Sequence, residues 1–227
     1  MGALSLGLES FWGVPLAALA GALGALSVVY LVARAHRASP YTLLLSGVMV
    51  GSFSAALLLF LLWLAPADPA ETVLFWLAGD LSWADPRWLP WAAGWIGVSF
   101  LALWSQAPAL DLFTQGEEAA ADLGLDVGRR RLAVFAAAGA LTAGAVACAG
   151  LVGFVGLVVP HAVRILWGPA HGRLLPASVL LGAAFLVGAD AAARTVLAPS
   201  EIPVGVVTAL VGAPFFLHLL RRGEAQR

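Results

Sequence analysis

The sequence predicts an all-α polytopic membrane protein with about seven transmembrane helices, and three features support this fold class. Of its 227 residues, 61% are hydrophobic and only 11% are charged, whereas soluble domains typically contain about 25% charged residues. The apolar residues fall into runs that are long enough to cross the hydrocarbon core, which takes roughly 20 helical residues. Proline, glycine and charged residues separate these runs. We therefore expect one transmembrane domain over residues 1–227, with no room for a separate soluble domain.

The composition also excludes several functions. All 12 basic residues are arginine, so no lysine can form the Schiff base of a retinal photoreceptor. The net charge of −1 lacks the basic surplus of a nucleic-acid-binding protein. The one cysteine, Cys148, cannot form an intrachain disulfide or a metal cluster by itself. The sequence contains no phosphate loop of the Walker type and no recognisable catalytic triad, so we expect neither an ATPase nor a hydrolase, and no catalytic residues, bound metal or cofactor in the chain itself.

Three spans are expected in the first half of the chain. Residues 14–33 form the first, and residues 41–65, which two prolines follow, form the second. Residues 71–77 are too few to cross the membrane, so they predict a helix near the interface. Residues 89–104 form the third span, and the tryptophans near its start are typical of an aromatic belt: Trp83, Trp88, Trp91 and Trp95.

The second half supplies four more spans. Residues 132–163 contain no Asp, Glu or Arg, but a single helix of this length would measure about 48 Å and exceed the hydrocarbon core. We therefore expect a full span at 132–149 and a shorter returning helix at 152–166, whose turn is buried in protein. Residues 174–196 and 203–220 complete the seven. Three glycines lie at the expected reversal: Gly150, Gly153 and Gly156.

The distribution of arginine predicts the orientation. In this arrangement ten arginines lie on one side of the membrane, and only Arg87 and Arg194 lie on the other. Cytoplasmic connections carry the excess of basic residues, so the ten mark the cytoplasmic side. We expect the N-terminus outside and the C-terminus in the cytoplasm.

The cytoplasmic connection at residues 111–131 predicts a short helix with signals at both ends. Thr114 and Glu117 match the Thr-x-x-Glu capping box, and Gly124 suits a left-handed C-terminal cap. Asp126 is a second N-cap candidate, just before the next span. Such a polar helix can be a solvated connection, or it can be a rigid lever that docks into a groove of a cytoplasmic partner.

Four segments in order carry a resemblance to a known family. They are residues 116–124 (GEEAAADLG), residues 153–161 (GFVGLVVPH) with Arg164 after them, Asp190 with Arg194, and residues 201–216 (EIPVGVVTALVGAPFF). Together they resemble the permease subunits of iron-siderophore, haem and cobalamin ABC importers, the FecCD type. The resemblance extends from about the first span to the C-terminus.

This resemblance implies a subunit that forms the translocation pathway in the bacterial cytoplasmic (inner) membrane. It implies three protein partners: a cytoplasmic ATP-binding subunit, a second permease subunit in a homo- or heterodimer, and an extracytoplasmic substrate-binding protein. ATP and Mg²⁺ would be held by the ATP-binding subunit. The chain itself would not be an enzyme.

The resemblance also implies roles for particular residues. Arg194 would dock the substrate-binding protein. Asp190 and Arg194 are spaced i,i+4 in an apolar helix, so they can equally form a structural intramembrane pair, and both roles can hold together. Contact with the ATP-binding subunit would involve Gly116, Glu117, Glu118, Ala119, Ala120, Leu123 and Gly124. Candidates for a helix kink or for gating are Gly153, Gly156, Pro160 and Pro214.

The expected span count differs from that of the family. Members have about ten spanning helices, so the seven spans correspond to the last seven, and we expect a chain that lacks roughly the first three. A truncated product, a misassigned start and half of a split permease all fit this expectation. The alternatives are an ion-coupled secondary transporter and a non-functional permease fragment. A secondary transporter usually carries several intramembrane ionisable residues, whereas this chain offers only Asp190 and Arg194, which favours the ABC importer.

Overall fold

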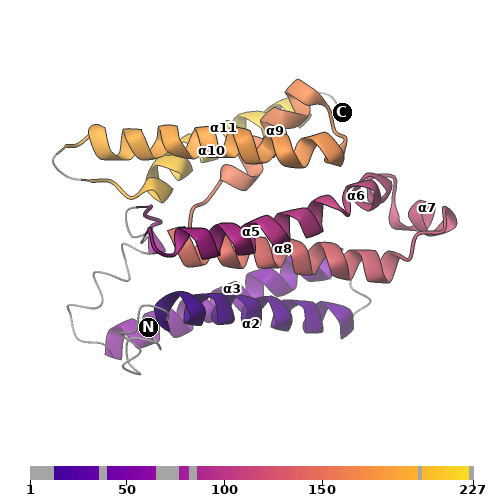
Figure 1. Ribbon diagram of the computed structural model, residues 1–227, viewed down its shortest axis with the longest axis horizontal. Coiled ribbons are helices and arrows are strands. Elements are labelled where there is room, and N and C mark those ends of the chain that lie inside the picture. The colour runs from indigo at the N-terminus through magenta and orange to yellow at the C-terminus, as the bar shows by residue number, and fades with distance from the viewer. Residues whose placement is uncertain (1–12, 36–39, 65–76, 82–85, 199–200, 225–227) are drawn as a thin grey trace.

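The computed structural model describes residues 13–35, 40–64, 77–81, 86–198 and 201–224, and these residues are predominantly helical (Figure 1). No strand occurs within these ranges, so the predicted all-α class is confirmed. The helices are α2 (Gly13–Ala35), α3 (Pro40–Leu64), α5 (Leu89–Trp104), α6 (Ala107–Phe113), α7 (Glu117–Asp122), α8 (Val127–Ala149), α9 (Val155–Trp167), α10 (His171–Thr195) and α11 (Val204–Glu224).

Each predicted span corresponds to a helix, although only some of the helices are long enough to cross alone. Among the described residues, α3, α8 and α10 are long and apolar enough to span a membrane. The pair α5 and α6, bent by 50°, would make a fourth span if counted together. The apolar parts of α2, α9 and α11 are shorter, so the count of seven stays a prediction. The interfacial helix expected at 71–77 lies outside the described residues, apart from Leu77.

The helices form three groups in space (Figure 1). Helices α5 and α8 pack side by side, α8 also packs on α2, and α3 follows α2 on that side. Helices α9, α10 and α11 pack together as a separate group. Helix α6 lies at one end and contacts α10, so it bridges the central pair and this group.

Small residues on α8 allow the close approach of its neighbours. A methyl group at Gly139 would collide with the side chain of Leu26 on α2, and one at Gly144 would collide with the ring of Trp95 on α5. The Trp95 indole N–H also donates a 2.8 Å hydrogen bond to the carbonyl oxygen of Ala140. Close packing of this kind drives helix association in a bilayer, where lipid is as apolar as the side chains. Helix α8 is therefore the central helix of the described part.

Candidate coupling and docking sites

Helix α7 projects at one end of the molecule, beyond the start of α8 (Figure 1). Its N-cap is Gly116, with φ 106° and ψ 151°, a backbone conformation essentially restricted to glycine. The predicted capping box between Thr114 and Glu117 is wrong, because the cap position is occupied by Gly116 and no side chain caps the helix. The Thr114 hydroxyl instead donates to the carbonyl oxygen of Asp111 at 2.7 Å, at the C-terminal end of α6.

The C-terminal end of α7 has the geometry that its glycine predicted. Gly124 adopts φ 85°, its N–H donates to the carbonyl oxygen of Ala121, and the N–H of Leu125 donates to that of Ala120. These two hydrogen bonds form a Schellman motif, which satisfies carbonyls left free at the helix end. The short helix therefore has a defined end that limits fraying.

The side chains of α7 divide between those that face the molecule and those that face outward. Ala120 is buried, and Glu117 forms an ion pair with Arg131 on α8. Glu118 and Leu123 are exposed, and no ion pair of Glu118 is present within the described ranges. Asp122 is exposed as well, so the outward surface combines two carboxylates, Glu118 and Asp122, with one large apolar side chain, Leu123.

An unexpected helix, α6, connects this element to the rest of the fold. Asp111 of α6 accepts a 2.8 Å hydrogen bond from the backbone N–H of His171, and the same carboxylate oxygen lies 2.6 Å from Nδ1 of the His171 ring. The backbone hydrogen bond, followed by the bond to the imidazole, lowers the pKa of Asp111, which lies beyond the predicted span at residues 89–104. Arg130 of α8 donates to the side-chain oxygen of Gln106 at 2.9 Å. Helix α6 is thus held from two sides.

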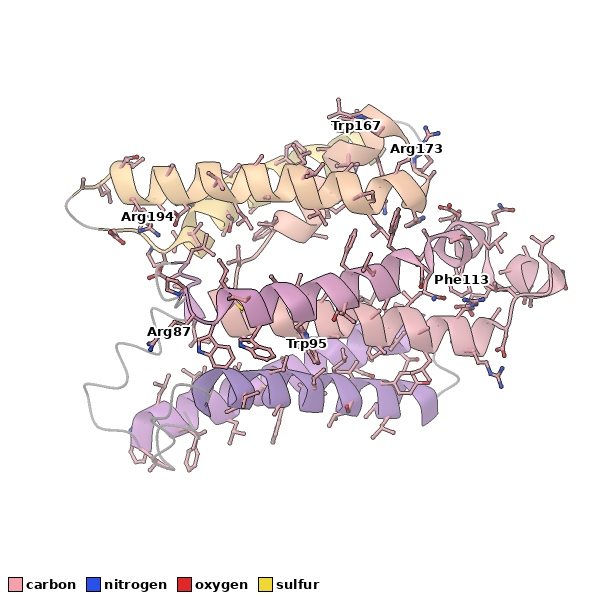
Figure 2. All side chains as sticks on the ribbon, in the orientation of Figure 1. Arg87, Trp95, Phe113, Trp167, Arg173 and Arg194 are labelled. Carbon is pink, nitrogen blue, oxygen red and sulfur yellow. The ribbon has the colours of Figure 1, made fainter. Side chains whose placement is uncertain are left out.

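The opposite end of the molecule carries Arg194 (Figure 2). Its guanidinium donates two hydrogen bonds to the Asp190 carboxylate, from Nε at 2.8 Å and from Nη2 at 3.2 Å. Both side chains are partly exposed, and Glu201 and Asp80 lie close enough to act on Arg194 electrostatically. A bidentate pair of this kind fixes the direction of the guanidinium. Arg194 is therefore oriented by its own helix before any partner arrives.

The kink and gating candidates lie just before α9, within α9 and within α11. Pro160 lies inside α9 and Pro214 inside α11, where each removes a helical hydrogen-bond donor. Of the three glycines expected at the reversal, only Gly150 has a positive φ, 67°, while Gly153 and Gly156 do not. The second left-handed residue is Phe154, whose Cβ occupies the place that a methyl group on Gly212 would need. The reversal thus depends on Gly150 and Phe154.

A family comparison bears directly on these sites. The family model described as the FecCD transport family matches residues 1–222. The chain belongs to the FecCD transport family. The match includes α7, α9, α10 and almost all of α11, so both candidate sites lie within it.

Curated FecCD relatives and a solved structure agree with this assignment. The chain is 44% identical over 217 residues to the cobalamin import system permease protein BtuC of Halobacterium salinarum, covering 94% of this chain and 58% of that protein. It is 38% identical over 220 residues to the iron(3+)-hydroxamate import system permease protein FhuG of Bacillus subtilis, covering 95% and 65%. A metal-chelate type ABC transporter solved in an inward-facing conformation matches with a TM-score of 0.85 at 30% identity, covering 94% of this chain and 68% of that one. The chain thus spans less than two thirds of the length of either of these two curated relatives.

The sequence did not reveal three residues that hold the end of this FecCD chain where α7 lies. Asp111 of α6 contacts His171 of α10, 60 positions away, and Arg131 of α8 pairs with Glu117 of α7, 14 positions away. The only local signal was Pro108, which stands in the first turn of α6 and is favoured there. Pairing between distant helices leaves no periodic pattern, so these contacts could only be seen in the fold.

Proposed function

We propose that this chain is a permease subunit of an ABC importer that carries iron chelates, cobalamin or a related metal complex. The observation that carries the proposal is the FecCD match over residues 1–222, within which the capped helix α7 projects from one end of the molecule. The relatives supply the substrate class, because their names specify cobalamin and iron-hydroxamate import. The helices would line or support the pathway, and ATP hydrolysis would take place on a separate subunit.

Helix α7 is proposed as the contact with that ATP-binding subunit, which would hold ATP and Mg²⁺. A helix with defined ends transmits a push better than a flexible connection, and α7 has both an N-cap glycine and a Schellman motif. Glu118 and Leu123 are the side chains offered outward, whereas Glu117 is engaged by Arg131. Glu118 and Leu123 would therefore bind in the groove of the partner, and Glu117 would hold the helix in place.

The remaining partners follow from the same proposal. The substrate-binding protein would dock at the end that carries Arg194, oriented by Asp190. A second permease subunit would complete the pathway. The transporter would lie in the cytoplasmic membrane. The arginine distribution supports an orientation with α7 and the C-terminus in the cytoplasm and the N-terminus outside.

Reversal of one charge tests the contact with the ATP-binding subunit. Glu118→Arg should weaken co-purification of that subunit about tenfold, which corresponds to roughly 1.4 kcal/mol of binding free energy. The matched control is Glu201→Arg, the same substitution on an exposed glutamate at the other end of the molecule. Equal recovery of the ATP-binding subunit with both variants would contradict the role of α7.

A further inference from the structure

Helix α10 connects the two candidate sites. It runs from His171 to Thr195, and its 25 residues measure about 38 Å at 1.5 Å per residue. Its first residue contacts α6 beside the coupling element, and its last turns carry Asp190 and Arg194 (Figures 1 and 2). One continuous helix therefore reaches from the coupling end to the docking end.

The first turn of α10 is held by residues from other helices. Its N-cap, Ala170, has no side chain that could accept a hydrogen bond, and Asp111 of α6 fills this role by accepting from the N–H of His171. The His171 ring adds a second contact to the same oxygen, and its side chain is only 14% exposed. The Trp104 indole N–H donates to the carbonyl oxygen of Gly172 at 3.0 Å. The start of α10 is thus attached to α5 and α6 by three hydrogen bonds.

Helix α6, which holds the start of α10, is also connected directly to α7. Only residues 114–116 separate α6 from α7, and Ala107 and Ala109 of α6 are buried. A push on α7 can pass directly to α8 through the Glu117–Arg131 pair. It can also pass along α6 to the contact between Asp111 and His171, and from there to α10.

We propose that Asp111 and His171 are positioning residues that join the coupling element to α10. Through this joint, displacement of α7 by the ATP-binding subunit moves α10 and with it the Asp190–Arg194 pair at the opposite end. The proposal rests on the proposed function and deepens it, because it identifies the route by which the nucleotide state reaches the docking surface. The carboxylate suits this role because hydrogen bonds to a charged acceptor are stronger than neutral ones.

A distance measurement in the assembled complex tests the joint. Two spin labels would be attached at Leu197→Cys, just after α10, and at Leu89→Cys, at the start of α5, in a Cys148→Ala background. The chain and its ATP-binding subunit would be reconstituted in nanodiscs, and the label distance measured by pulsed electron resonance with and without ATP plus orthovanadate. The expected result is a nucleotide-dependent shift that Asp111→Asn abolishes and Asp111→Glu retains. The matched control is Glu201→Gln, an exposed carboxylate outside α6, α7 and α10, which should keep the shift.

The variant His171→Ala distinguishes a loss of folding from a loss of the movement that passes from α7 to α10. This variant keeps the backbone N–H that Asp111 caps, so α10 should still fold, but it loses the ring contact and should lose the shift. The thermal melting temperature of each variant reports folding. A shift that persists in either Asp111→Asn or His171→Ala, or a bound complex whose label distance never responds to nucleotide, would overturn the joint. Failure of the unmodified chain to bind the ATP-binding subunit would instead overturn the proposed function, so the two failures can be told apart.

Discussion

Neighbouring acidic residues on α7 have different environments. Both glutamates are exposed, but Glu117 is paired with Arg131, whereas Glu118 has no ion pair within the described ranges. Consecutive helical residues point about 100° apart, so one can face α8 while the next faces outward. The sequence grouped both with the partner contact, but only the fold could separate them, because Arg131 lies 14 positions away. The side chain proposed to bind a partner and the side chain that pairs with α8 are therefore adjacent in the sequence.

The contact between Asp111 and His171 predicts a dependence of stability on pH. The pKa of Asp111 is lowered in the folded protein, first by the His171 backbone hydrogen bond. Its contribution to the free energy of unfolding is therefore fully present above the unfolded pKa of about 3.9, and it is lost as the pH falls through the folded pKa. The melting temperature of Asp111→Asn should lie below that of the unmodified chain at about pH 6, and the gap should narrow as the pH falls below about 3.9. A gap that does not change with pH would contradict this assignment.

Arg194 and Asp190 give a prediction for docking. Arg194→Glu should weaken binding of the substrate-binding protein about tenfold or more, because an interfacial charge is replaced by its opposite. Asp190→Asn should have a smaller effect, because the variant keeps the positive charge of Arg194 and weakens only the contact that orients the guanidinium. Binding to immobilised complex in nanodiscs measures both. If the unmodified chain, Arg194→Glu and Asp190→Asn all bound the substrate-binding protein with equal affinity, Arg194 would not belong to the docking surface.

At the scale of the helices, the sequence located the elements better than their ends. The bounds of α5 are those predicted, 89–104, but α8 begins at Val127 and not at 132. The predicted span began at the first apolar residue, whereas the helix extends back to Asp126, whose side chain accepts from the N–H of Arg129. The prediction of Asp126 as an N-cap is therefore confirmed. Similarly, α10 begins at His171 and not at 174, because Asp111 caps it from another helix. A local cap can be read from sequence, but one supplied across the fold cannot.

The reversal between α8 and α9 gives a prediction about one glycine. Gly150 has φ 67° and ψ −154°, a conformation essentially restricted to glycine, while Gly153 has no positive φ and open space around it among the described residues. Gly150→Ala should destabilise the protein by about 1–3 kcal/mol. Gly153→Ala serves as the control and should have little effect. Chemical denaturation in detergent would compare the two variants, and similar losses would show that the strain is not confined to Gly150.

At the scale of the whole molecule, residues 77–81 join helices that are far apart in sequence. The N–H of Asp80 donates to the carbonyl oxygen of Ala149 at the end of α8, and the N–H of Gly205 in α11 approaches the carbonyl oxygen of Gly79 at 3.5 Å. A methyl group on Gly205 would collide with the backbone of Ala78. Composition and hydropathy correctly indicated a helical membrane protein, but they carry no information on such backbone contacts, which depend on how the helices pack. The grouping of helices therefore had to come from the structure.

The orientation in the membrane is a further prediction for the whole molecule. Cys148 is the one cysteine of the chain, so Cys148→Ala provides a background for single labels. Gln115 and Leu197 are exposed near the two opposite ends, the first between α6 and α7 and the second just after α10. A membrane-impermeant maleimide applied to intact cells should label Leu197→Cys and should label Gln115→Cys only after the cells are opened. The reason is that basic residues are retained in the cytoplasm, and Arg129, Arg130 and Arg131 lie close to Gln115 in the sequence. The reverse labelling pattern would place α7 outside, where no ATP-binding subunit could reach it.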